Sequence, residues 1–410
     1  MIARLIFARP YSECSRNEKL GVFVRKRCSK HPSLLVRYKT VSLNNYITLG
    51  NSGLRVSPFC LGTMTFGMEW GWGSTEEESH KILDHFFAKG GNFLDTANVY
   101  TKGHSEVIIG NYLHRNSFRR DQAVIATKFF GTLYPGDPNA GGANRKSIMA
   151  ACEASLRRMK TDYIDLYWMH CWDYHTPIEE TMAALDDLVR QGKVRYVGFS
   201  DTPAWKVAQA QMIAKFRGWA PLIALQIEYS LLERTVEGEL VPMAKELGLG
   251  ITPWSPLKYG ILSGKYTREN RDKVDAARGE WVTGHLKKDS TYDVIDVVIK
   301  VAKETGSSPA RVALSWLQAK AGVASSIIGA RTLEQLDDNL GALDLHLSAE
   351  QMRMLDEVSA PKLNFPYDFV KTSGPFRSAE TTINGEVVGV SPMAPQSDSE
   401  RFDKAPVGVR

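Results

Sequence analysis

The sequence predicts an α/β protein built on a (β/α)8 barrel, or TIM barrel. Two observations predict it. Eight short apolar runs recur along the chain with amphipathic segments between them, and the length of 410 residues suits one barrel with extensions. A doubly wound open sheet is the alternative, but the G-x-G-x-x-G motif of that fold does not follow the first run. The glycines there, Gly67, Gly71 and Gly73, have a different spacing.

A short N-terminal hairpin is expected before the barrel. The stretch YITLGNSGLRVS alternates around Asn51, Ser52 and Gly53, which favours two short strands joined by a tight turn. The eight expected barrel strands follow as continuously apolar runs, as in a parallel sheet covered on both faces. They are residues 59–64, 92–97, 123–130, 163–170, 194–200, 222–229, 249–256 and 323–330.

Helix-start signals lie between these runs. Ser74 and Glu77 have the spacing of a capping box, and Gly90 marks the end of the helix that it would open. A second helix is expected from Thr176, with Pro177 at its first position. Both carry apolar residues at helical spacing: Ile82, Leu83, Phe86 and Phe87 in the first, and Ile178, Met182, Leu185 and Val189 in the second.

Three segments are expected along the chain: a basic extension over residues 1–44, the barrel over 45–360 and a tail over 361–410. The tail holds six of the eighteen prolines and shows no helical period, so it is expected either to wrap the barrel or to be disordered. Two long loops, 131–144 and about 257–288, would lie at the C-terminal mouth of the barrel, where loop variation builds active sites.

Composition and charge narrow the function classes. Hydrophobic residues make up 43% of the chain, and no apolar run approaches the ~18 residues of a membrane helix. Five cysteines without a C-x-x-C pair argue against a disulfide framework or a metal site. Residues 1–44 hold ten Lys or Arg and two Glu, so the rest has a net charge of −3 and no bias toward nucleic acid. We expect a cytoplasmic protein; the Arg-rich start leaves a mitochondrial transit peptide as the alternative.

Four chemically active side chains fall at the ends of three consecutive strands. Asp95 ends the second run and Tyr100 follows it. Lys128 lies in the third run, and His170 ends the fourth. Taken singly, each has an ordinary structural explanation, such as a capping Asp or a hydrogen-bonded core His. Together they are expected to converge, because the carboxyl ends of barrel strands meet at one face.

Such a set can donate a proton. An isolated tyrosine with a pKa near 10 is a poor acid at pH 7, and lowering that pKa by about two units needs about 2.7 kcal/mol of differential interaction. We expect Lys128 to supply it by favouring the tyrosinate of Tyr100. Asp95 would keep Lys128 charged, while His170 would orient a substrate oxygen through a hydrogen bond.

At these residues the sequence resembles the aldo-keto reductase superfamily. The matching motifs are GGNFLDTANVY with Asp95 and Tyr100, ATKF with Lys128, and DLYWMH with His170. The resemblance covers about residues 46–360. It implies a barrel that binds NADP(H) without a Rossmann motif and transfers hydride between nicotinamide and a carbonyl group.

The resemblance also implies a set of cofactor contacts. The family usually has Asn where this chain has Asp201, and a carboxylate cannot donate to the carboxamide oxygen. Trp254 stands where many members have a stacking Tyr, and the larger ring keeps the stack. Arg331 is expected to meet the 2′-phosphate and so to favour NADPH over NADH. The implied residues are Gly62, Thr63, Met64, Asp95 and Trp254 at the nicotinamide; Ser200, Asp201 and Gln226 at its carboxamide; Ser255, Pro256, Leu257, Gly260 and Lys265 at the pyrophosphate; and Gly329, Arg331, Thr332, Gln335 and Asn339 at the adenosine phosphate.

Two functions remain open. The favoured one is an NADPH-dependent reductase of aldehydes or ketones, with a small-molecule carbonyl compound as partner; the stretch DTPAW from Asp201 resembles aryl-alcohol dehydrogenase-type reductases. The alternative is a cofactor-binding regulatory subunit with little turnover, because WSPLKYGILSGK from Trp254 resembles the potassium-channel β-subunit branch. An oligomer is compatible with either function.

The expected mouth of the barrel points to aromatic or otherwise apolar substrates. Its loops carry rings that would bury apolar surface, and few donors that could orient a polyol. Cations that could clamp a substrate carboxylate are not evident there, although Lys258 could turn inward. The apolar mouth residues are Met64, Trp70, Trp72, Phe129, Phe130, Trp172 and Tyr259.

Overall fold

The computed structural model describes most of the chain from Ser42 onward. The described residues are 42–115, 120–273, 280–378, 381–383, 385–387, 389–391, 393–395 and 397–401. Residues 1–41 of the expected basic extension therefore lie outside the described residues. The first described strands, β1 (Ile47–Thr48) and β2 (Arg55–Val56), pair antiparallel as the predicted hairpin.

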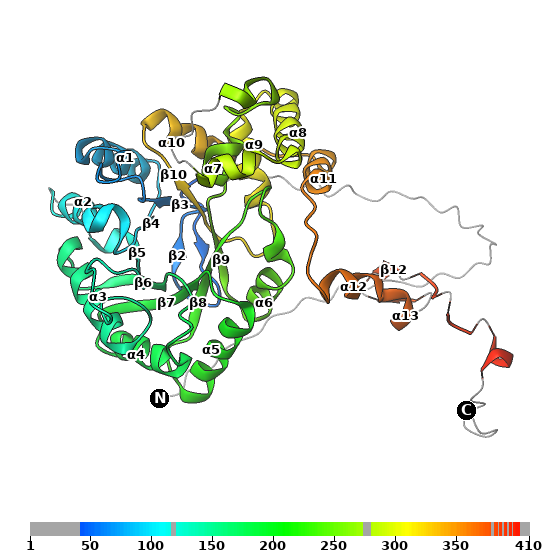
Figure 1. Cartoon of the computed structure of the whole chain (residues 1–410), viewed down its shortest axis with the longest axis horizontal. Coiled ribbons are helices and arrows are strands. Elements are labelled where there is room, and N and C mark those ends of the chain that lie inside the picture. The colour runs from blue at the N-terminus through cyan, green and yellow to red at the C-terminus, as the bar shows by residue number, and fades with distance from the viewer. Residues whose placement is uncertain are drawn as a thin grey trace, which may run out of the picture. The chain divides into compact units, whose positions relative to one another are not determined.

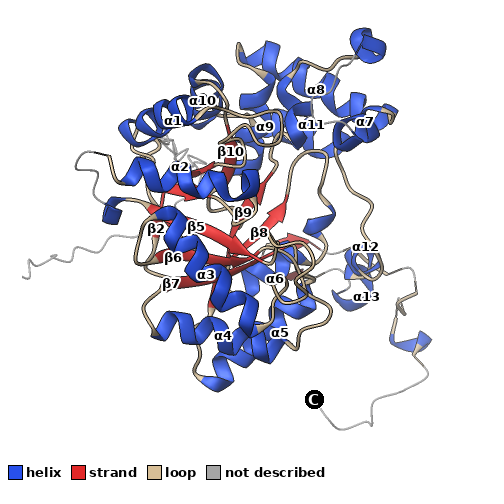
Figure 2. Ribbon diagram, turned by 60° about the vertical axis from the view of Figure 1, so that its left-hand side comes forward, coloured by secondary structure: helices blue, strands red, loops and turns tan. Residues whose placement is uncertain are grey.

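Eight parallel strands form a nearly closed barrel, and helices surround it (Figures 1 and 2). The strands are β3 (Phe59–Gly62), β4 (Phe93–Asp95), β5 (Val124–Phe129), β6 (Ile164–Met169), β7 (Val194–Ser200), β8 (Leu222–Glu228), β9 (Gly250–Trp254) and β10 (Ser326–Gly329). Neighbours pair in chain order from β3 to β9, and β10 returns to pair with β3. A parallel bridge between Ile251 of β9 and Val323, just before β10, joins these last two strands of the barrel. The predicted fold class and all eight predicted strands are confirmed.

Helices follow the strands around the outside of the barrel. They are α1 (Glu76–Ala88), α2 (His104–Leu113), α3 (Arg145–Met159), α4 (Ile178–Arg190), α5 (Ala204–Arg217), α6 (Leu240–Glu246), α7 (Glu280–Leu286), α8 (Asp289–Thr305), α9 (Pro309–Gln318), α10 (Leu333–Leu340) and α11 (Ala349–Val358). Within the part of the chain that the structure describes, none of the helices combines the length and apolar character needed to cross a membrane.

The two long loops differ in structure. Residues 131–144 form the predicted irregular loop, which ends where Asn144 caps α3. The stretch 257–288 is not a plain loop, because its described part contains the 3-10 turns η4 (Lys258–Ser263) and η5 (Arg268–Lys273) as well as α7. These turns are too short to leave a periodic apolar pattern in the sequence.

Two predicted helix starts are each displaced by one residue. The capping box of α1 is formed by Thr75 and Glu78: the Thr75 hydroxyl accepts from the Glu78 N–H (3.3 Å), and the Glu78 carboxylate accepts from the Thr75 N–H (2.9 Å). Ser74 does not cap the helix, because its hydroxyl donates to a backbone carbonyl of the loop after β10. Pro177 precedes α4 rather than opening it.

Alternation along the strands decides which side chains face the barrel interior. In β5, Val124 and Ala126 belong to the cluster inside the barrel, whereas Ile125 and Phe129 pack against the helices. A strand has a period of two residues, so Lys128 shares the inner face with Val124 and Ala126. The inner face thus changes from apolar to charged toward the carboxyl end of the strand.

The hairpin closes the amino-terminal end of the barrel. Leu49 and Val56 pack in the same interior cluster as Leu166 and Trp168 of β6. The Asn51 N–H also donates to the carbonyl of Gly248, just before β9 (2.7 Å). With this end filled by apolar side chains, the polar interior residues are confined to the opposite end.

Ordered packing begins earlier than the predicted barrel boundary. Leu43 falls within the stretch 1–44 assigned to the extension, yet it is buried (4% exposed) in the main hydrophobic core. Its neighbour Asn44 lies against Gly90, at the end of α1. The packed structure therefore includes Leu43 and Asn44, which the predicted boundary assigned to the extension.

The tail is more regular than expected. It contains α12 (Tyr367–Thr372), α13 (Gly374–Ser378) and the antiparallel pair β11 (Thr382–Ile383) and β12 (Glu386–Val387). Leu363 is buried, and the Tyr367 hydroxyl donates to the Glu239 carboxylate (2.8 Å) beside α6. These short elements were not predicted, because elements of two to six residues are too short to show a period. The contacts of Leu363 and Tyr367 fit the alternative of a tail that lies against the barrel.

Candidate active site

The four candidate catalytic residues lie at the carboxyl end of the barrel. Asp95 is the last residue of β4, and Lys128 lies near the end of β5 on its inner face. His170 follows β6 directly, and Tyr100 opens the 3-10 turn η1 (Tyr100–Gly103) after β4. Parallel pairing of β4, β5 and β6 aligns these ends, so the structure brings the four residues together.

Lys128 is the centre of this cluster. Its side chain is fully buried, and its ammonium donates to the Asp95 carboxylate, to the Thr96 carbonyl (2.8 Å) and to the Tyr100 hydroxyl (3.1 Å). These contacts use all three N–H donors of an ammonium. Burial by itself lowers the pKa of Lys128, but Asp95 and Tyr100 outweigh burial, and the pKa is raised above its ordinary value. Lys128 is therefore charged at neutral pH.

Asp95 is held from two sides. One carboxylate oxygen accepts from Lys128, and the other accepts from the side-chain amide of Gln226 in β8 (2.9 Å). Asp95 is almost fully buried, so these contacts compensate the charge that it carries inside the barrel. The amide orientation of Gln226 leaves its carbonyl oxygen free to accept a hydrogen bond from a ligand.

His170 lies beside Tyr100. The two ring centroids are 5.9 Å apart and the rings are nearly perpendicular, at 80°. Burial, with a smaller contribution from the charge of Lys128, lowers the pKa of His170 to about 3. The imidazole is neutral at physiological pH and so has one N–H donor and one acceptor nitrogen. Such a ring can donate a hydrogen bond to a carbonyl oxygen.

The pKa of Tyr100 departs from the expected direction. Burial raises it, the charge of Lys128 lowers it, and Asp95 raises it again, so that the pKa ends above its ordinary value. The expected lowering fails because the phenolate would lose its hydration, while Asp95 neutralises part of the field of Lys128. The phenol of Tyr100 is therefore protonated throughout the neutral range.

A strained turn holds Tyr100 in place. The next two residues, Thr101 and Lys102, have left-handed backbone angles, with φ of 47° and 58°. The Thr101 hydroxyl donates to the Phe66 carbonyl (2.8 Å), which ties the turn to the loop after β3. Strained backbone of this kind is common at functional sites.

Ser200 and Gln226 fit the carboxamide of a nicotinamide. They are paired neighbours at the ends of β7 and β8. Ser200 Oγ is buried and has no hydrogen-bond partner among the described residues. A buried polar atom without a partner is rare in folded proteins, and a ligand group with a donor and an acceptor would satisfy it.

The loop after β9 offers a phosphate group one exposed cation, Lys265. Ser255, Lys258, Tyr259 and Gly260 all have left-handed backbone angles. The N–H groups of Lys258, Tyr259 and Gly260 are bonded within the loop, to the Ser255 carbonyl, the Ser255 hydroxyl and the Leu257 carbonyl, so this backbone does not face an anion. The exposed side chain of Lys265 lies beside this loop, 3.7 Å from where a Cβ on Gly260 would stand. Of the other two implied residues, Pro256 is buried and Leu257 packs against the core.

The start of α10 fits a second anionic group. The Thr332 hydroxyl accepts from the Gln335 N–H (3.3 Å), and the Gln335 side chain accepts from the N–H of Arg331 (3.0 Å). Asn339 donates to the carbonyl of Gly329 (3.2 Å). The Arg331 side chain is exposed beside this helix start, where N–H groups and the helix dipole favour negative charge.

The implied nicotinamide contacts after β3 are less uniform. Thr63 is buried, and its hydroxyl donates to the backbone carbonyl of Asp95 (3.1 Å). A Cβ on Gly62 would come within 2.7 Å of the Ile327 side chain. Thr63 therefore supports the backbone at Asp95, whereas Gly62 packs closely against β10 and Met64 is half-buried.

Asp201 and Trp254 form a link across the mouth that the sequence did not predict. The Trp254 indole N–H donates to the Asp201 carboxylate (3.0 Å). Asp201 has a left-handed backbone angle (φ 41°) and is exposed at the mouth, yet loss of hydration raises its pKa to about 6. The Trp254 hydrogen bond acts in the opposite direction, toward a lower pKa.

The mouth aromatics divide into two groups. Trp70 meets the ring of Tyr100 edge-on (centroids 6.4 Å apart) and lies against Trp72 (5.7 Å), so both belong to the rim of the site. Phe129 packs in the core and does not line the mouth. Lys258 is not free to clamp a substrate carboxylate, because its buried ammonium donates to the Glu228 carboxylate (2.7 Å), which shares a face of β8 with Gln226.

Comparisons with known proteins agree with this geometry. A family model described as Aldo/keto reductase family matches residues 58–360. An uncharacterized oxidoreductase of Bacillus subtilis (strain 168) is 38% identical over 322 residues, which are 76% of this chain and 95% of the relative. The NADP(+) aryl-alcohol dehydrogenase of Phanerodontia chrysosporium is 38% identical over 330 residues, 77% of this chain and 86% of the relative. Norsolorinic acid reductase B of Aspergillus parasiticus is 35% identical over 350 residues, 83% and 88% respectively.

Proposed function

The chain belongs to the aldo/keto reductase family of nicotinamide-dependent oxidoreductases, and from that premise we propose that it uses NADPH to reduce aromatic or otherwise apolar aldehydes and ketones to alcohols. Tyr100 donates the proton to the carbonyl oxygen. Lys128 and Asp95 support that proton transfer, and His170 orients the substrate.

The observation that carries this proposal is the double contact of Lys128. Its ammonium bonds the Asp95 carboxylate and lies 3.1 Å from the Tyr100 hydroxyl inside a buried cluster. Proton loss from Tyr100 would leave a phenolate next to a fixed positive charge. In a site of low polarity, such a prepositioned charge stabilises the developing anion without reorganisation.

Reduction of a carbonyl group requires a hydride at carbon and a proton at oxygen. NADPH, when bound, supplies the hydride. The protonated phenol of Tyr100 supplies the proton, and Lys128 stabilises the phenolate that remains. The neutral His170 ring donates a hydrogen bond to the same carbonyl oxygen and thereby fixes its orientation.

Two observations support NADPH over NADH. Arg331 presents an exposed guanidinium beside the start of α10, and a guanidinium binds phosphate through paired N–H donors. A relative that is 38% identical carries NADP(+) in its name. Lys265, beside the strained loop after β9, is the candidate contact for the pyrophosphate.

The rim of the site supports an aromatic or apolar substrate. Trp70 and Trp72 present rings next to Tyr100, and Lys258, which could otherwise bind a substrate carboxylate, is paired with Glu228. The printed names of relatives include an aryl-alcohol dehydrogenase and a norsolorinic acid reductase. Rings at the rim would bury the body of such a substrate at roughly 25 cal/mol per Å².

A spectrophotometric panel tests the proposal. NADPH consumption is followed with aromatic and aliphatic aldehydes, and Tyr100→Phe serves as the inactive control. Turnover by the unmodified chain and none by the variant would support an enzyme that works through Tyr100. Tight NADPH binding without turnover on any aldehyde would favour the alternative, a regulatory subunit of the channel-β type.

A further inference from the structure

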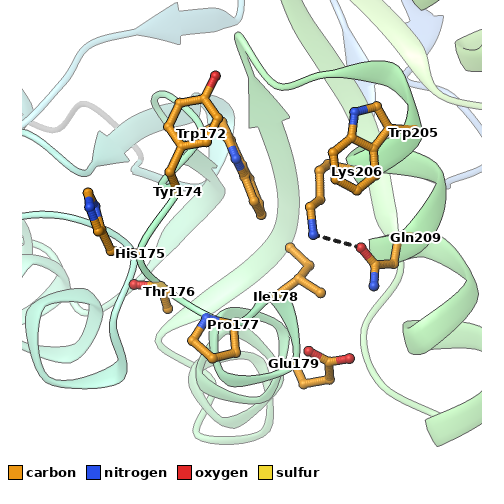
Figure 3. A pocket seen from close by; sticks show the side chains of 10 residues that line it. All are labelled: Trp172, Tyr174, His175, Thr176, Pro177, Ile178, Glu179, Trp205, Lys206 and Gln209. Atoms are coloured by element: carbon orange, nitrogen blue, oxygen red, sulfur yellow. Dashed lines mark hydrogen bonds between the residues drawn. The ribbon is translucent and has the colours of Figure 1, made fainter.

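A groove lies between the start of α4 and the start of α5 (Figure 3). None of the four catalytic side chains lines it. Its cavity has a volume of about 460 Å³, within the range of sites for small molecules. Trp172 forms one wall and Trp205, the second residue of α5, forms the other. Because Trp172 is only two residues beyond His170, the groove adjoins the active-site end of the barrel.

Lys206 places a positive charge at the centre of this groove. Its nitrogen lies 4.9 Å from the ring centre of Trp172 and 4.5 Å from that of Trp205, so the ammonium sits between two indoles. It donates one hydrogen bond, to the side chain of Gln209 (2.9 Å). Among the described residues no carboxylate forms an ion pair with Lys206. Two of its three N–H donors remain available to an external acceptor.

The walls of the groove also expose aromatic surface. Trp205 is 63% exposed and Tyr174 is 83% exposed, whereas Trp172 is almost buried and holds the Tyr174 ring edge-on at 6.3 Å. Large exposed rings beside a fixed cation form a platform on which a flat molecule can stack. The two cation–π contacts already hold Lys206 in place, so little conformational entropy remains to be lost on binding.

The charges around the groove decide which flat molecule fits. A cationic ligand is disfavoured, because the ammonium of Lys206 would repel it. A neutral aromatic molecule would leave the two donors of Lys206 unused. Glu179, on the first turn of α4, also lines the groove and disfavours a ligand with several negative charges. An aromatic ring with a single carboxylate satisfies all of these conditions.

We propose that this groove is a binding site for aromatic carboxylates, with the ring stacked on Trp205 and the carboxylate bonded to the Lys206 ammonium. The site is distinct from the reduction at Tyr100, and its occupancy does not depend on turnover.

Fluorine NMR on the full chain labelled with 5-fluorotryptophan tests this proposal. The Trp205 resonance is identified by its disappearance in Trp205→Phe. We expect 2-naphthoate to shift that resonance in a saturable manner and 2-naphthalenemethanol, its neutral analogue, to shift it far less. Lys206→Met should weaken naphthoate binding about fivefold or more, and added salt should weaken it further.

Two matched variants complete the experiment. Lys206→Arg keeps the charge and should restore binding, which separates loss of the ion pair from a damaged fold. Lys215→Met removes an exposed cation from the same helix outside the groove and should leave binding unchanged. Equal binding of the neutral analogue, an unshifted Trp205 resonance, or equal loss in Lys206→Met and Lys215→Met would each overturn the proposal.

Discussion

The side-chain nitrogen of Lys128 lies 3.1 Å from the hydroxyl oxygen of Tyr100 while it also bonds the carboxylate of Asp95. Tyr100 thus has a cation at its proton-bearing atom, and that cation is fixed by a buried anion. The arrangement separates two tasks. Burial keeps Tyr100 protonated before the reaction, and Lys128 stabilises the phenolate that proton transfer would leave.

Removal of the Tyr100 hydroxyl should abolish carbonyl reduction. In Tyr100→Phe we expect kcat to fall by about 100-fold or more, the usual contribution of a positioned proton donor, with little change in NADPH affinity. Steady-state kinetics and quenching of protein fluorescence by NADPH measure the two effects. Tyr112→Phe, which removes a hydroxyl bonded to Asp84 outside the site, should keep its activity. A Tyr100→Phe enzyme that retained more than a few per cent of kcat would assign the proton to another group.

Lys128→Met should be inactive for a different reason. The variant keeps the phenol but removes the charge that stabilises its anion, and it leaves Asp95 as a buried carboxylate with one partner fewer. We expect a similar loss of kcat together with a lower Tm. Thermal melting and turnover measured on the same sample would show both. Full activity of the Lys128→Met variant would show that Lys128 does not support the proton transfer.

Arg331→Ala should reduce the preference for NADPH. The loss of paired charge-assisted hydrogen bonds to a 2′-phosphate should raise the Kd for NADPH about tenfold and leave the weaker NADH binding unchanged. Titration of both cofactors against the variant measures this preference. Arg353→Ala is the matched control, because Arg353 is an exposed arginine of α11 that pairs with Glu350. An unchanged ratio of the two Kd values in Arg331→Ala would exclude the assigned role.

The aromatic rim should set the order of substrates. We expect a substituted benzaldehyde to give a higher kcat/KM than an aliphatic aldehyde, an aldose or a 2-keto acid, because Trp70 and Trp72 offer apolar surface next to Tyr100. All four compounds are compared at one pH and one NADPH concentration. A clear advantage for the aldose or the keto acid would contradict the proposed substrate class.

Asp201→Asn should stabilise the protein in a pH-dependent way. Since the pKa of Asp201 is raised from 3.8 to about 6, the folded state binds more protons than the unfolded state between these values. Stability contributed by this group is therefore lost as pH rises through that window. We expect a higher Tm for Asp201→Asn at pH 7 and no gain below about pH 4, with a small effect because the residue is exposed. Asp344→Asn, an exposed aspartate of the turn Gly341–Asp344, should show no such trend.

Deletion at the amino terminus should reveal where packing begins. A chain that starts at Ser42 should fold and react normally, whereas deletion of residues 1–44 also removes the buried Leu43 and should lower the free energy of unfolding by about 2 kcal/mol. Urea melts of the two truncated chains measure the difference. Equal stability would show that Leu43 contributes nothing, and loss of folding in the shorter deletion would place essential contacts before Ser42.

The sequence predicted the barrel well because its signals are local. Strands buried on both faces are continuously apolar, and each of the eight runs contains one. Lys128 and Asp95 could be predicted to converge because both lie at the carboxyl ends of strands, and these ends meet at one face of a barrel. The cap of α1 could not be fixed from sequence, because Ser74 and Thr75 have equivalent hydroxyls and only contacts after folding distinguish them.

The features that sequence reasoning missed all depend on distant contacts. The pKa of Tyr100 results from a balance between burial and charge that has no local signature. The Asp201 carboxylate meets the Trp254 indole across 53 positions of the chain. Lys206 lies between two tryptophans, one adjacent in sequence and one on the loop after β6. The position of Lys206 near the start of α5 does not indicate in the sequence that Trp172 lies beside it.

The pairing of β3 with β10 has a consequence for the synthesis of the protein on the ribosome. One edge of β3 finds its partner only after Ser326–Gly329 has been synthesised, near the end of the barrel. Until then the nascent chain presents an unpaired strand edge, which other chains can extend. Messages truncated between β9 and β10 should thus yield aggregation-prone fragments that require chaperones, and not merely inactive protein.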